Sequence, residues 1–549
     1  MIEKFVNSTN FSSYEDFKGN FKLIIPDNFN FGFDVMDEWA KSAPNRLGLI
    51  WCDDHNNEVK LTFEDIRQQS NKLANYLTSL GIGKADPIML ILKRHYEFWI
   101  SMIALHKIGA IAIPATHMLT TKDIVYRNNA AGVKAIIAAD DEYVLNQIDQ
   151  SRPSSPTLQH CIVARGSREG WLSYQEGCAV QSTDFPRPAN MQTIKDDDIS
   201  LIYFTSGTTG NPKMVMHNFY YPLGHIVTAK FWQNVQEEGI HLTVADSGWA
   251  KCAWGKLYGQ WIAGAIIFVY DMDKFISKNL LEIIAKYHIE TFCAPPTIYR
   301  YIIKEDFSKY DLSALKYCTT AGEPLNPEVY NQFYKLTGIK LKEGFGQSES
   351  TVMLGTFVFM EPNPGSTGKP SPIYDIDLID ENGASCEIGE EGQICIRHHG
   401  DKHVGISLGY YREPEQTAKV WKDGIYHTGD IAWKDEKGFY WFVGRTDDVI
   451  KSSGYLIGPF EVESALMTHP SVLECAITGV PDPVRGQVIK ATIVLAKGWT
   501  PSEELVKEIQ EHVKHTTAPY KYPRIVEFVD ELPKTISGKI KRNHLRDKD

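Results

Sequence analysis

Residues 203–213, with the sequence YFTSGTTGNPK, have the composition of a phosphate-binding loop. An apolar run leads into hydroxyl and glycine residues, and a lysine closes the segment. Small residues expose backbone N–H groups, hydroxyls donate hydrogen bonds, and a lysine neutralises charge, all of which suit a phosphate group. The Walker loop is excluded, because it would need a glycine at Pro212 and a serine or threonine at Met214. The expected phosphate ligands are Thr205, Ser206, Gly207, Thr208, Thr209, Gly210 and Lys213.

Five further segments follow in order along the chain. They are AGEP at 321–324, GFGQSE at 344–349, YHTGD at 426–430, VGRTDDVIK at 443–451 with SGY at 453–455, and PKTISGK at 533–539. With the first segment, they resemble the motifs of the acyl-adenylate-forming enzymes, which include acyl-CoA synthetases, peptide-synthetase adenylation domains and luciferases. One such motif is a weak signal, whereas six in the right order are a strong one. Ser348 replaces the family's threonine, and residues 1–200 carry no diagnostic motif.

The resemblance implies a two-step reaction with ATP, CoA and Mg²⁺. A carboxylate attacks the α-phosphorus of Mg-ATP to give an acyl-adenylate and pyrophosphate, and the CoA thiol then displaces AMP. By resemblance, Lys539 stabilises the first transition state, and the C-terminal domain rotates about Asp447 so that the loop 451–458 faces the site in the second step. The matched set contains no obvious general acid or base. Catalysis is therefore expected to work through positioning and charge neutralisation.

The matched positions also have a physical interpretation. Phe345 offers an aromatic face for adenine, Glu349 is a hard oxygen ligand for Mg²⁺, and Asp430 and Arg445 can hydrogen-bond to the ribose. Taken singly, each is more often a core aromatic or a surface charge. The implied catalytic set is Lys213, Glu349 and Lys539, and the other implied nucleotide or CoA contacts are Gly322, Glu323, Pro324, Phe345, Gly346, Gln347, Ser348, Asp430, Arg445, Gly454 and Tyr455.

Two apolar segments, 246–261 and 291–296, resemble those that line the acyl site of short- and medium-chain enzymes. The expected substrate contacts are Trp249, Lys251, Trp254, Cys293 and Gly346. Acetate-specific relatives tend to carry a bulky aromatic where this chain has Gly346, so the glycine is expected to leave room for a longer tail. A medium-chain or branched short-chain acid is favoured, although core tryptophans and a snorkelling lysine explain the same residues equally well.

Three other functions remain open. The chain could be an acetyl- or propionyl-CoA synthetase, a stand-alone adenylation domain that loads a carrier protein, or a catalytically silent nucleotide-binding protein. No carrier-like serine segment follows the last motif, which makes the carrier-loading adenylation domain a less favoured alternative. The joint presence of Lys213, Glu349, Asp430, Arg445 and Lys539 argues against the third. An esterase is not supported, because no G-x-S-x-G surrounds the candidate serines.

The elements that must position these groups alternate between strand and helix patterns. In the first 140 residues, strands are predicted at 47–51, 58–61, 87–92, 110–115 and 133–139, and helices from Thr62 and over 96–107 and 122–131. This order predicts a parallel sheet. Residues 150–200 are expected to be a surface connection before a strand at 199–204, and short strands from Gly392 predict a β-rich subdomain. We expect an α/β fold with a large N-terminal acyl- and ATP-binding domain at 1–446 and a small mobile α+β domain at 447–549.

Composition limits the class of protein and its partners. Fifty-seven basic against 69 acidic side chains give a net charge of −12, which disfavours nucleic acid as a partner. The nine scattered cysteines show no zinc-ligand spacing and favour a reducing compartment. No signal region and no membrane-spanning apolar run is visible, so we expect a cytoplasmic enzyme with small-molecule substrates. A homo-oligomer is left open.

Overall fold

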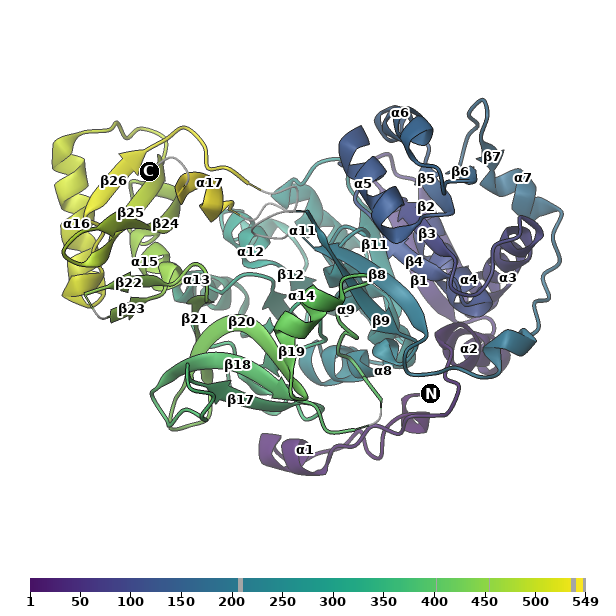
Figure 1. The fold of residues 1–549 in the computed structure, drawn as a ribbon, viewed down its shortest axis with the longest axis horizontal. Coiled ribbons are helices and arrows are strands. Elements are labelled where there is room, and N and C mark those ends of the chain that lie inside the picture. The colour runs from purple at the N-terminus through teal and green to yellow at the C-terminus, as the bar shows by residue number, and fades with distance from the viewer. Residues whose placement is uncertain (206–210, 401, 454, 535–539, 547–549) are drawn as a thin grey trace.

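The computed structural model describes residues 1–205, 211–400, 402–453, 455–534 and 540–546. Two large sheets form the greater part of the molecule (Figure 1). Six neighbouring strands of the nine-stranded sheet are parallel, and its edge strands are antiparallel. In spatial order its strands are β16 (Lys369–Pro370), β15 (Leu354–Gly355), β14 (Leu341–Phe345), β13 (Tyr317–Ala321), β12 (Thr291–Ala294), β10 (Ile240–Thr243), β11 (Ile266–Asp271), β1 (Leu47–Asp53) and β2 (Glu58–Thr62).

The second large sheet has seven strands, of which only the last pair is antiparallel. In spatial order they are β7 (Leu172–Ser173), β6 (His160–Ala164), β5 (Ala135–Ala139), β3 (Pro87–Ile91), β4 (Ile111–Pro114), β8 (Ile199–Thr205) and β9 (Lys213–Asn218). The parallel βα units predicted for the N-terminal region are therefore confirmed.

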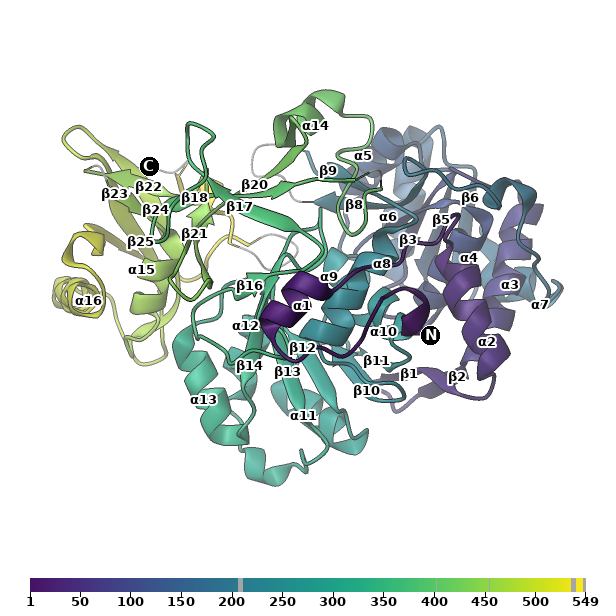
Figure 2. The ribbon, with the colours of Figure 1, turned by 90° about the horizontal axis from the view of Figure 1, so that it is seen from below.

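Helices fill the space between the two large sheets and cover their outer faces (Figures 1 and 2). Helices α3 (Phe63–Ser79), α4 (Glu97–Ile108), α8 (Tyr221–Ile226), α9 (Ala250–Lys256) and α10 (Tyr258–Ile262) share the central core with both sheets. Helices α5 (Thr121–Ala131) and α6 (Glu142–Ser151) pack on the outer face of the seven-stranded sheet. Helices α11 (Ser277–Lys286), α12 (Pro296–Ile302) and α13 (Pro327–Thr337) pack on the outer face of the nine-stranded sheet.

The period-2 geometry of a strand explains this layering. In β3, Ile88 and Leu90 belong to the central core, whereas Met89 and Ile91 belong to the core beneath α5 and α6. Successive side chains of a strand point to opposite faces, so an uninterrupted apolar run feeds two cores. The run PIMLI is apolar throughout because both of its faces are buried.

The chain then forms two smaller sheets (Figure 1). The first is antiparallel and comprises β17 (Asp375–Ile379), β18 (Glu391–Arg397), β19 (Trp421–Lys422), β20 (Ile425–Lys434) and β21 (Tyr440–Arg445), which confirms the β-rich subdomain. The second comprises β22 (Ile450–Ser452), β23 (Tyr455–Ile457), β24 (Val472–Asp482), β25 (Gly486–Leu495) and β26 (Ile525–Phe528). It carries α15 (Pro459–Leu466), α16 (Glu503–Thr516) and α17 (Arg542–Arg546) and forms the separate lobe seen in Figure 1. The remaining helices are α1 (Tyr14–Asn20), α2 (Glu38–Ser42), α7 (Tyr174–Ala179) and α14 (Pro414–Val420).

Local sequence signals explain several helix ends. Thr62 and Asp65 form the capping box predicted from their spacing, and Thr120 with Asp123 forms a second one at α5. Two features differ from expectation. The predicted surface connection at 150–200 contains β6, β7 and α7, and the predicted N-terminal strands divide between two sheets, because β1 pairs in parallel with β11. The domain boundary at 446/447 stays a prediction.

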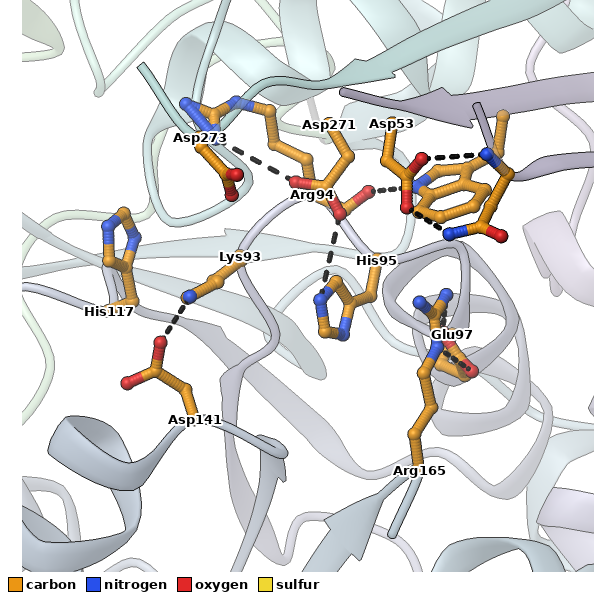
Figure 3. A network of polar contacts seen from close by, with 12 residues as sticks. Asp53, Lys93, Arg94, His95, Glu97, His117, Asp141, Arg165, Asp271 and Asp273 are labelled. Carbon is orange, nitrogen blue, oxygen red and sulfur yellow. Dashed lines mark hydrogen bonds and ion pairs between the residues drawn. The ribbon is translucent and has the colours of Figure 1, made fainter. Parts of the chain in front are cut away.

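A network of polar contacts lies at and just beyond the carboxyl ends of strands from both large sheets (Figure 3). Lys93 pairs with Asp141, and the Arg165 Nε atom lies 2.8 Å from Oε1 of Glu97. Asp271, at the end of β11, lies 3.9 Å from Arg94 Nη1 and 3.6 Å from His95 Nε2, both in the loop after β3. Burial raises the pKa of Asp271 to about 6. Because Asp271 of the nine-stranded sheet contacts Arg94 and His95 of the seven-stranded sheet, we interpret the group as joining the two sheets.

The cysteines are all free thiols, and seven of the nine are buried. Burial raises the pKa of Cys252 and of Cys395 to about 12, and that of Cys161 to about 11. The structure thus agrees with the interpretation of these residues as small apolar core side chains. No helix within the described residues has both the length and the apolar character needed to cross a bilayer.

Candidate active site

The predicted site residues occupy the carboxyl ends of parallel strands. Thr205 ends β8, Ala321 ends β13, and Phe345 ends β14, while Cys293 lies one residue before the end of β12. Ligands of open α/β sheets bind at this edge, because the strands end there and the following loops are free to vary. The main chain therefore places these residues at the carboxyl ends of strands in both large sheets, with Thr205 in the seven-stranded sheet and the other three in the nine-stranded sheet.

Lys213 and Glu349 meet at a residue that the sequence did not single out, Tyr410. The Tyr410 hydroxyl donates to Glu349 Oε1 at 3.0 Å, and the Lys213 ammonium lies 4.9 Å from the centre of the Tyr410 ring. Lys213 also opposes Thr205 across the β8–β9 pair. Burial, with the Glu349 charge second, raises the pKa of Tyr410, so its hydroxyl remains a donor. A cation and a carboxylate are thus fixed on one aromatic side chain.

Gln347, Asp430 and Arg445 form the second group. Asp430 and Arg445 face each other across β20 and β21, with 3.6 Å between Arg445 Nη1 and Asp430 Oδ1. The Gln347 amide donates to Asp430 and to the Thr428 carbonyl, and accepts from the Tyr426 hydroxyl at 2.7 Å. Burial acts to lower the pKa of Arg445, but Asp430 and other carboxylates outweigh it, and the pKa is raised. The predicted pair is held by a connected hydrogen-bond network.

Beside this network, β14 contains a buried acid that sequence analysis missed. Glu343 is two residues before Phe345 and is 6% exposed, and its Oε1 accepts weakly from the Leu325 amide at 3.4 Å. Its Oε2 has no hydrogen-bond partner among the described residues. Burial raises the pKa of Glu343 far above its ordinary value, so the neutral acid is favoured. The sequence LKEGF of β14 is mixed in polarity and gave no signal that this acid is buried.

The loop 321–324 is held from two sides. Lys251 donates to the Ala321 carbonyl at 2.5 Å, and Gly322 adopts a left-handed φ of 105° beside the Lys251 ammonium. The Glu323 carboxylate accepts from Thr297 of α12, and Arg300 Nη2 lies 3.6 Å from Glu323 Oε2. Pro324 follows as a half-buried residue. The structure thus brings Lys251, predicted as a substrate contact, to the loop predicted to bind adenine.

Trp254 fills the volume that Gly346 was expected to leave free. A Cβ atom at Gly346 would lie 2.4 Å from Trp254 Cη2, closer than any contact between real atoms of this kind. The indole Nε1 donates to the Ser350 carbonyl at 3.1 Å, and Trp254 is 6% exposed. The Trp232 indole packs against the backbone of Gly344 in a similar way, since a Cβ atom there would lie 2.5 Å from Trp232 Cε2. The expectation of an empty space is therefore corrected: the glycine is required because an indole packs across its backbone.

The other predicted acyl contacts are less conclusive. Trp249 is half-buried and caps the start of α9, and Cys293 is 1% exposed within β12. The Ser348 carbonyl lies 2.8 Å from the Nε2 atom of the buried residue His217.

The C-terminal lobe holds the remaining predicted residues. Asp447 Oδ1 lies 3.6 Å from Arg445 Nε, and the Tyr455 ring stacks on Tyr520 with 4.2 Å between centres. Tyr455 is 51% exposed. The predicted site residues Ser206, Gly207, Thr208, Thr209, Gly210, Gly454 and Lys539 lie outside the described residues.

Comparisons with known proteins agree with this arrangement. The AMP-binding enzyme family matches residues 36–411, and the AMP-binding enzyme C-terminal domain matches residues 461–539. Acyl-coenzyme A synthetase ACSM3, mitochondrial, from Mus musculus is 43% identical over 550 residues, covering 98% of this chain and 94% of that protein.

Solved structures show the same relationship. The anthranilate CoA ligase AuaEII, in complex with anthranoyl-AMP, aligns with a TM-score of 0.87 at 29% identity, over 95% of this chain and 98% of that one. The acyl-CoA synthetase of Brucella canis aligns with a TM-score of 0.74 at 30% identity, over 98% and 99%. Together, the fold, the motifs and these relatives define an ATP-dependent ligase that joins an acid to CoA. The chain belongs to the AMP-binding enzyme family, as an AMP-forming acyl-CoA synthetase.

Proposed function

We propose that this enzyme activates a medium-chain or branched short-chain carboxylic acid. The observation that carries the proposal is the apolar wall formed by Trp254 across Gly346, next to the strand end that bears Phe345. An apolar wall favours an alkyl tail, since each buried methylene contributes about 0.8 kcal/mol.

A second candidate substrate is acetate or propionate. The same contact favours it, because the Trp254 indole occupies part of the space in which a longer tail would lie. The two candidates therefore differ in whether the indole ends the pocket or forms one of its sides.

In the proposed reaction, Lys213 would neutralise charge on the ATP phosphates, and Glu349 would hold Mg²⁺, which would supply further positive charge there. A single carboxylate with phosphate and water oxygens suits Mg²⁺, which retains several waters. No group of three metal-ligating side chains occurs among the described residues, which fits such a shared site. Asp430 and Arg445 would bind the ribose, and Phe345 and Glu343 would contact adenine through its face and its 6-amino edge.

The two half-reactions would use different faces of the C-terminal lobe. We assign the boundary to 1–446 and 447–549, with Asp447 as the hinge. Lys539 would stabilise charge at the α-phosphorus during adenylation, and the segment with Gly454 and Tyr455 would contact CoA in the second step. Support comes from motif order and from the contacts of Asp447 described above.

The decisive test is a series of acids from acetate to decanoate, with CoA present and absent. AMP, pyrophosphate and thioester are measured for each acid. Highest kcat/KM at six to eight carbons supports the proposal, a maximum at two or three supports the second candidate, and adenylate without thioester supports a carrier-loading enzyme. Absence of AMP formation with every acid would overturn the proposal.

We also propose a cytoplasmic location, supported by nine free thiols, and a homo-oligomer remains open. The ACSM3 relative bears the word mitochondrial in its name, so the mitochondrion is the alternative compartment. Cell fractionation with an antibody to this chain distinguishes the two, and sedimentation of the purified enzyme gives the oligomeric state.

A further inference from the structure

The chain crosses between the β-rich subdomain and the C-terminal lobe within very few residues. Thr446 still belongs to the subdomain, because its amide and its hydroxyl both donate to the Gly429 carbonyl, at 2.9 and 3.0 Å. The Asp448 carboxylate is anchored in the lobe by arginines of α17, while its amide donates to the Arg445 carbonyl at 3.0 Å and closes a turn at the crossing. Asp447 is the residue between these two anchored neighbours. A change of backbone torsion there would rotate the lobe.

Helix α17 is tied directly to this crossing point. The Arg546 Nη1 atom donates to the Asp447 carbonyl at 2.6 Å, and its Nη2 atom lies 3.0 Å from Asp448 Oδ1. Arg542 Nη1 lies 3.8 Å from Asp448 Oδ2. The Asp448 side chain is only 12% exposed, so its charge is weakly screened.

The same helix is fixed to the body of the lobe. Arg542 donates to both oxygens of Glu463 in α15, at 2.6 and 2.9 Å, and Glu463 also accepts from the Ile477 amide of β24. Leu545, on the next turn, is 5% exposed and packs against Leu532 and Ala476. These charge-assisted hydrogen bonds from the Arg542 Nη2 atom and the apolar packing together leave α17 little freedom to move alone.

Helix α17 also begins just after the segment that carries Lys539. The two ends of that segment are joined, because Lys534 bridges Ile540 and the Lys541 amide donates to the Pro533 carbonyl at 2.8 Å. Arg542 follows immediately as the first residue of the helix. The base of the segment is therefore continuous with the helix that grips Asp447 and Asp448.

We propose that Arg546 is a positioning residue that couples the backbone at Asp447 to the base of the Lys539 segment through α17. The inference rests on the proposed roles of Asp447 and Lys539. By holding the Asp447 carbonyl and the Asp448 carboxylate at once, Arg546 couples the hinge torsion to α17 and so to the base of that segment at Pro533, Lys534, Ile540 and Lys541.

The experiment measures the two half-reactions separately in Arg546→Ala. Adenylation is followed by pyrophosphate release, and thioester formation by reaction of supplied acyl-adenylate with CoA. We expect adenylation to fall about 10- to 100-fold, the range for losing hydrogen bonds to a charged group, with thioester formation within about twofold. Arg546→Lys should recover only part, because a point charge cannot reproduce both contacts. Lys340→Ala, which breaks an exposed ion pair with Glu361, is the control and should change neither rate.

Combination with Lys539→Ala separates the coupling from a general loss of structure. If Arg546 acts through Lys539, its replacement should have no further effect in the Lys539→Ala background. Equal loss in both half-reactions, or a full additional loss in the double variant, overturns the inference. A strong effect of Lys539→Ala with none from Arg546→Ala overturns this inference alone, whereas no effect of Lys539→Ala on adenylation overturns the proposed role of the lysine itself. Asp448→Asn tests the same contact from the other side if Arg546→Ala does not fold.

Discussion

The contact between Gly346 and Trp254 gives the most direct test of how the acyl site is limited. In Gly346→Ala the new methyl group would lie 2.4 Å from Trp254 Cη2 and 2.7 Å from the Thr351 carbonyl oxygen. The carbonyl belongs to the backbone and can shift little, so the indole must move. Its hydrogen bond to the Ser350 carbonyl and its edge contact with Trp232 resist that movement.

The expected magnitude follows from overpacking. One extra methyl in a tightly packed site costs about 1 to 3 kcal/mol, which corresponds to about a 5- to 150-fold loss of kcat/KM if the indole enters the acyl path. Trp254→Leu should have the opposite effect on chain length, since each additional methylene that finds room adds about 0.8 kcal/mol, or close to fourfold.

The assay compares wild type, Gly346→Ala, Trp254→Leu and the double variant over acids from acetate to decanoate, with a melting curve for each. Gly346→Ala should lose most activity with the longer acids, and the double variant should regain part of it, because the smaller leucine removes the contact with the indole while the 2.7 Å contact with the Thr351 carbonyl remains. Gly19→Ala is a matched control, because a Cβ there meets no atom within 4 Å. The reasoning is refuted if Gly346→Ala melts like wild type and ranks the acids identically.

Three further predictions follow from the site. Asp447→Pro fixes φ and removes a backbone donor, so one half-reaction should fall far more than the other, and unchanged rates in both would locate the hinge elsewhere. Tyr410→Phe should slow pyrophosphate release about tenfold by removing the hydrogen bond to Glu349. Tyr410→Leu should slow it further, because the aromatic ring next to the Lys213 ammonium is also lost. A wild-type rate of pyrophosphate release in Tyr410→Phe would contradict this. Burial raises the folded-state pKa of Glu343, so its contribution to stability is present at low pH and is lost as pH rises from the unfolded towards the folded pKa. In melting curves from pH 5 to 9, the unfolding free energy of Glu343→Gln should rise relative to that of wild type by up to about 1.4 kcal/mol per pH unit within that window. Parallel pH profiles of the two proteins would show that the acid is ionised in the folded state.

Short-range signals in the sequence predicted the local elements well. The Thr62–Asp65 spacing predicted a capping box, and the apolar run at 291–294 coincides with β12. Both depend on neighbours within a few residues. The pairing of β1 with β11 could not be predicted in this way, because it joins residues more than 200 positions apart and because both strands are apolar on both faces.

The site shows the same division between features that local sequence signals predict and features that depend on long-range packing. The motifs predicted that Asp430 and Arg445 belong to one group, and antiparallel pairing brings them opposite each other. They could not identify Tyr410, whose role depends on a loop that folds back over β9. A glycine at 346 indicates only that no side chain begins there; which residue fills the space depends on the packing of a distant helix.

The buried thiols have a consequence for the chemistry of the intermediate. An acyl-adenylate is an acylating agent towards any accessible thiolate, and Cys252 directly follows Lys251 in α9. With a pKa of about 12, that thiol is ionised in only about one molecule in 10⁵ at pH 7, whereas an unperturbed thiol is ionised in a few per cent. Burial thus keeps the Cys252 thiol in its unreactive neutral form, so this side chain does not compete with the incoming CoA thiol for the acyl group.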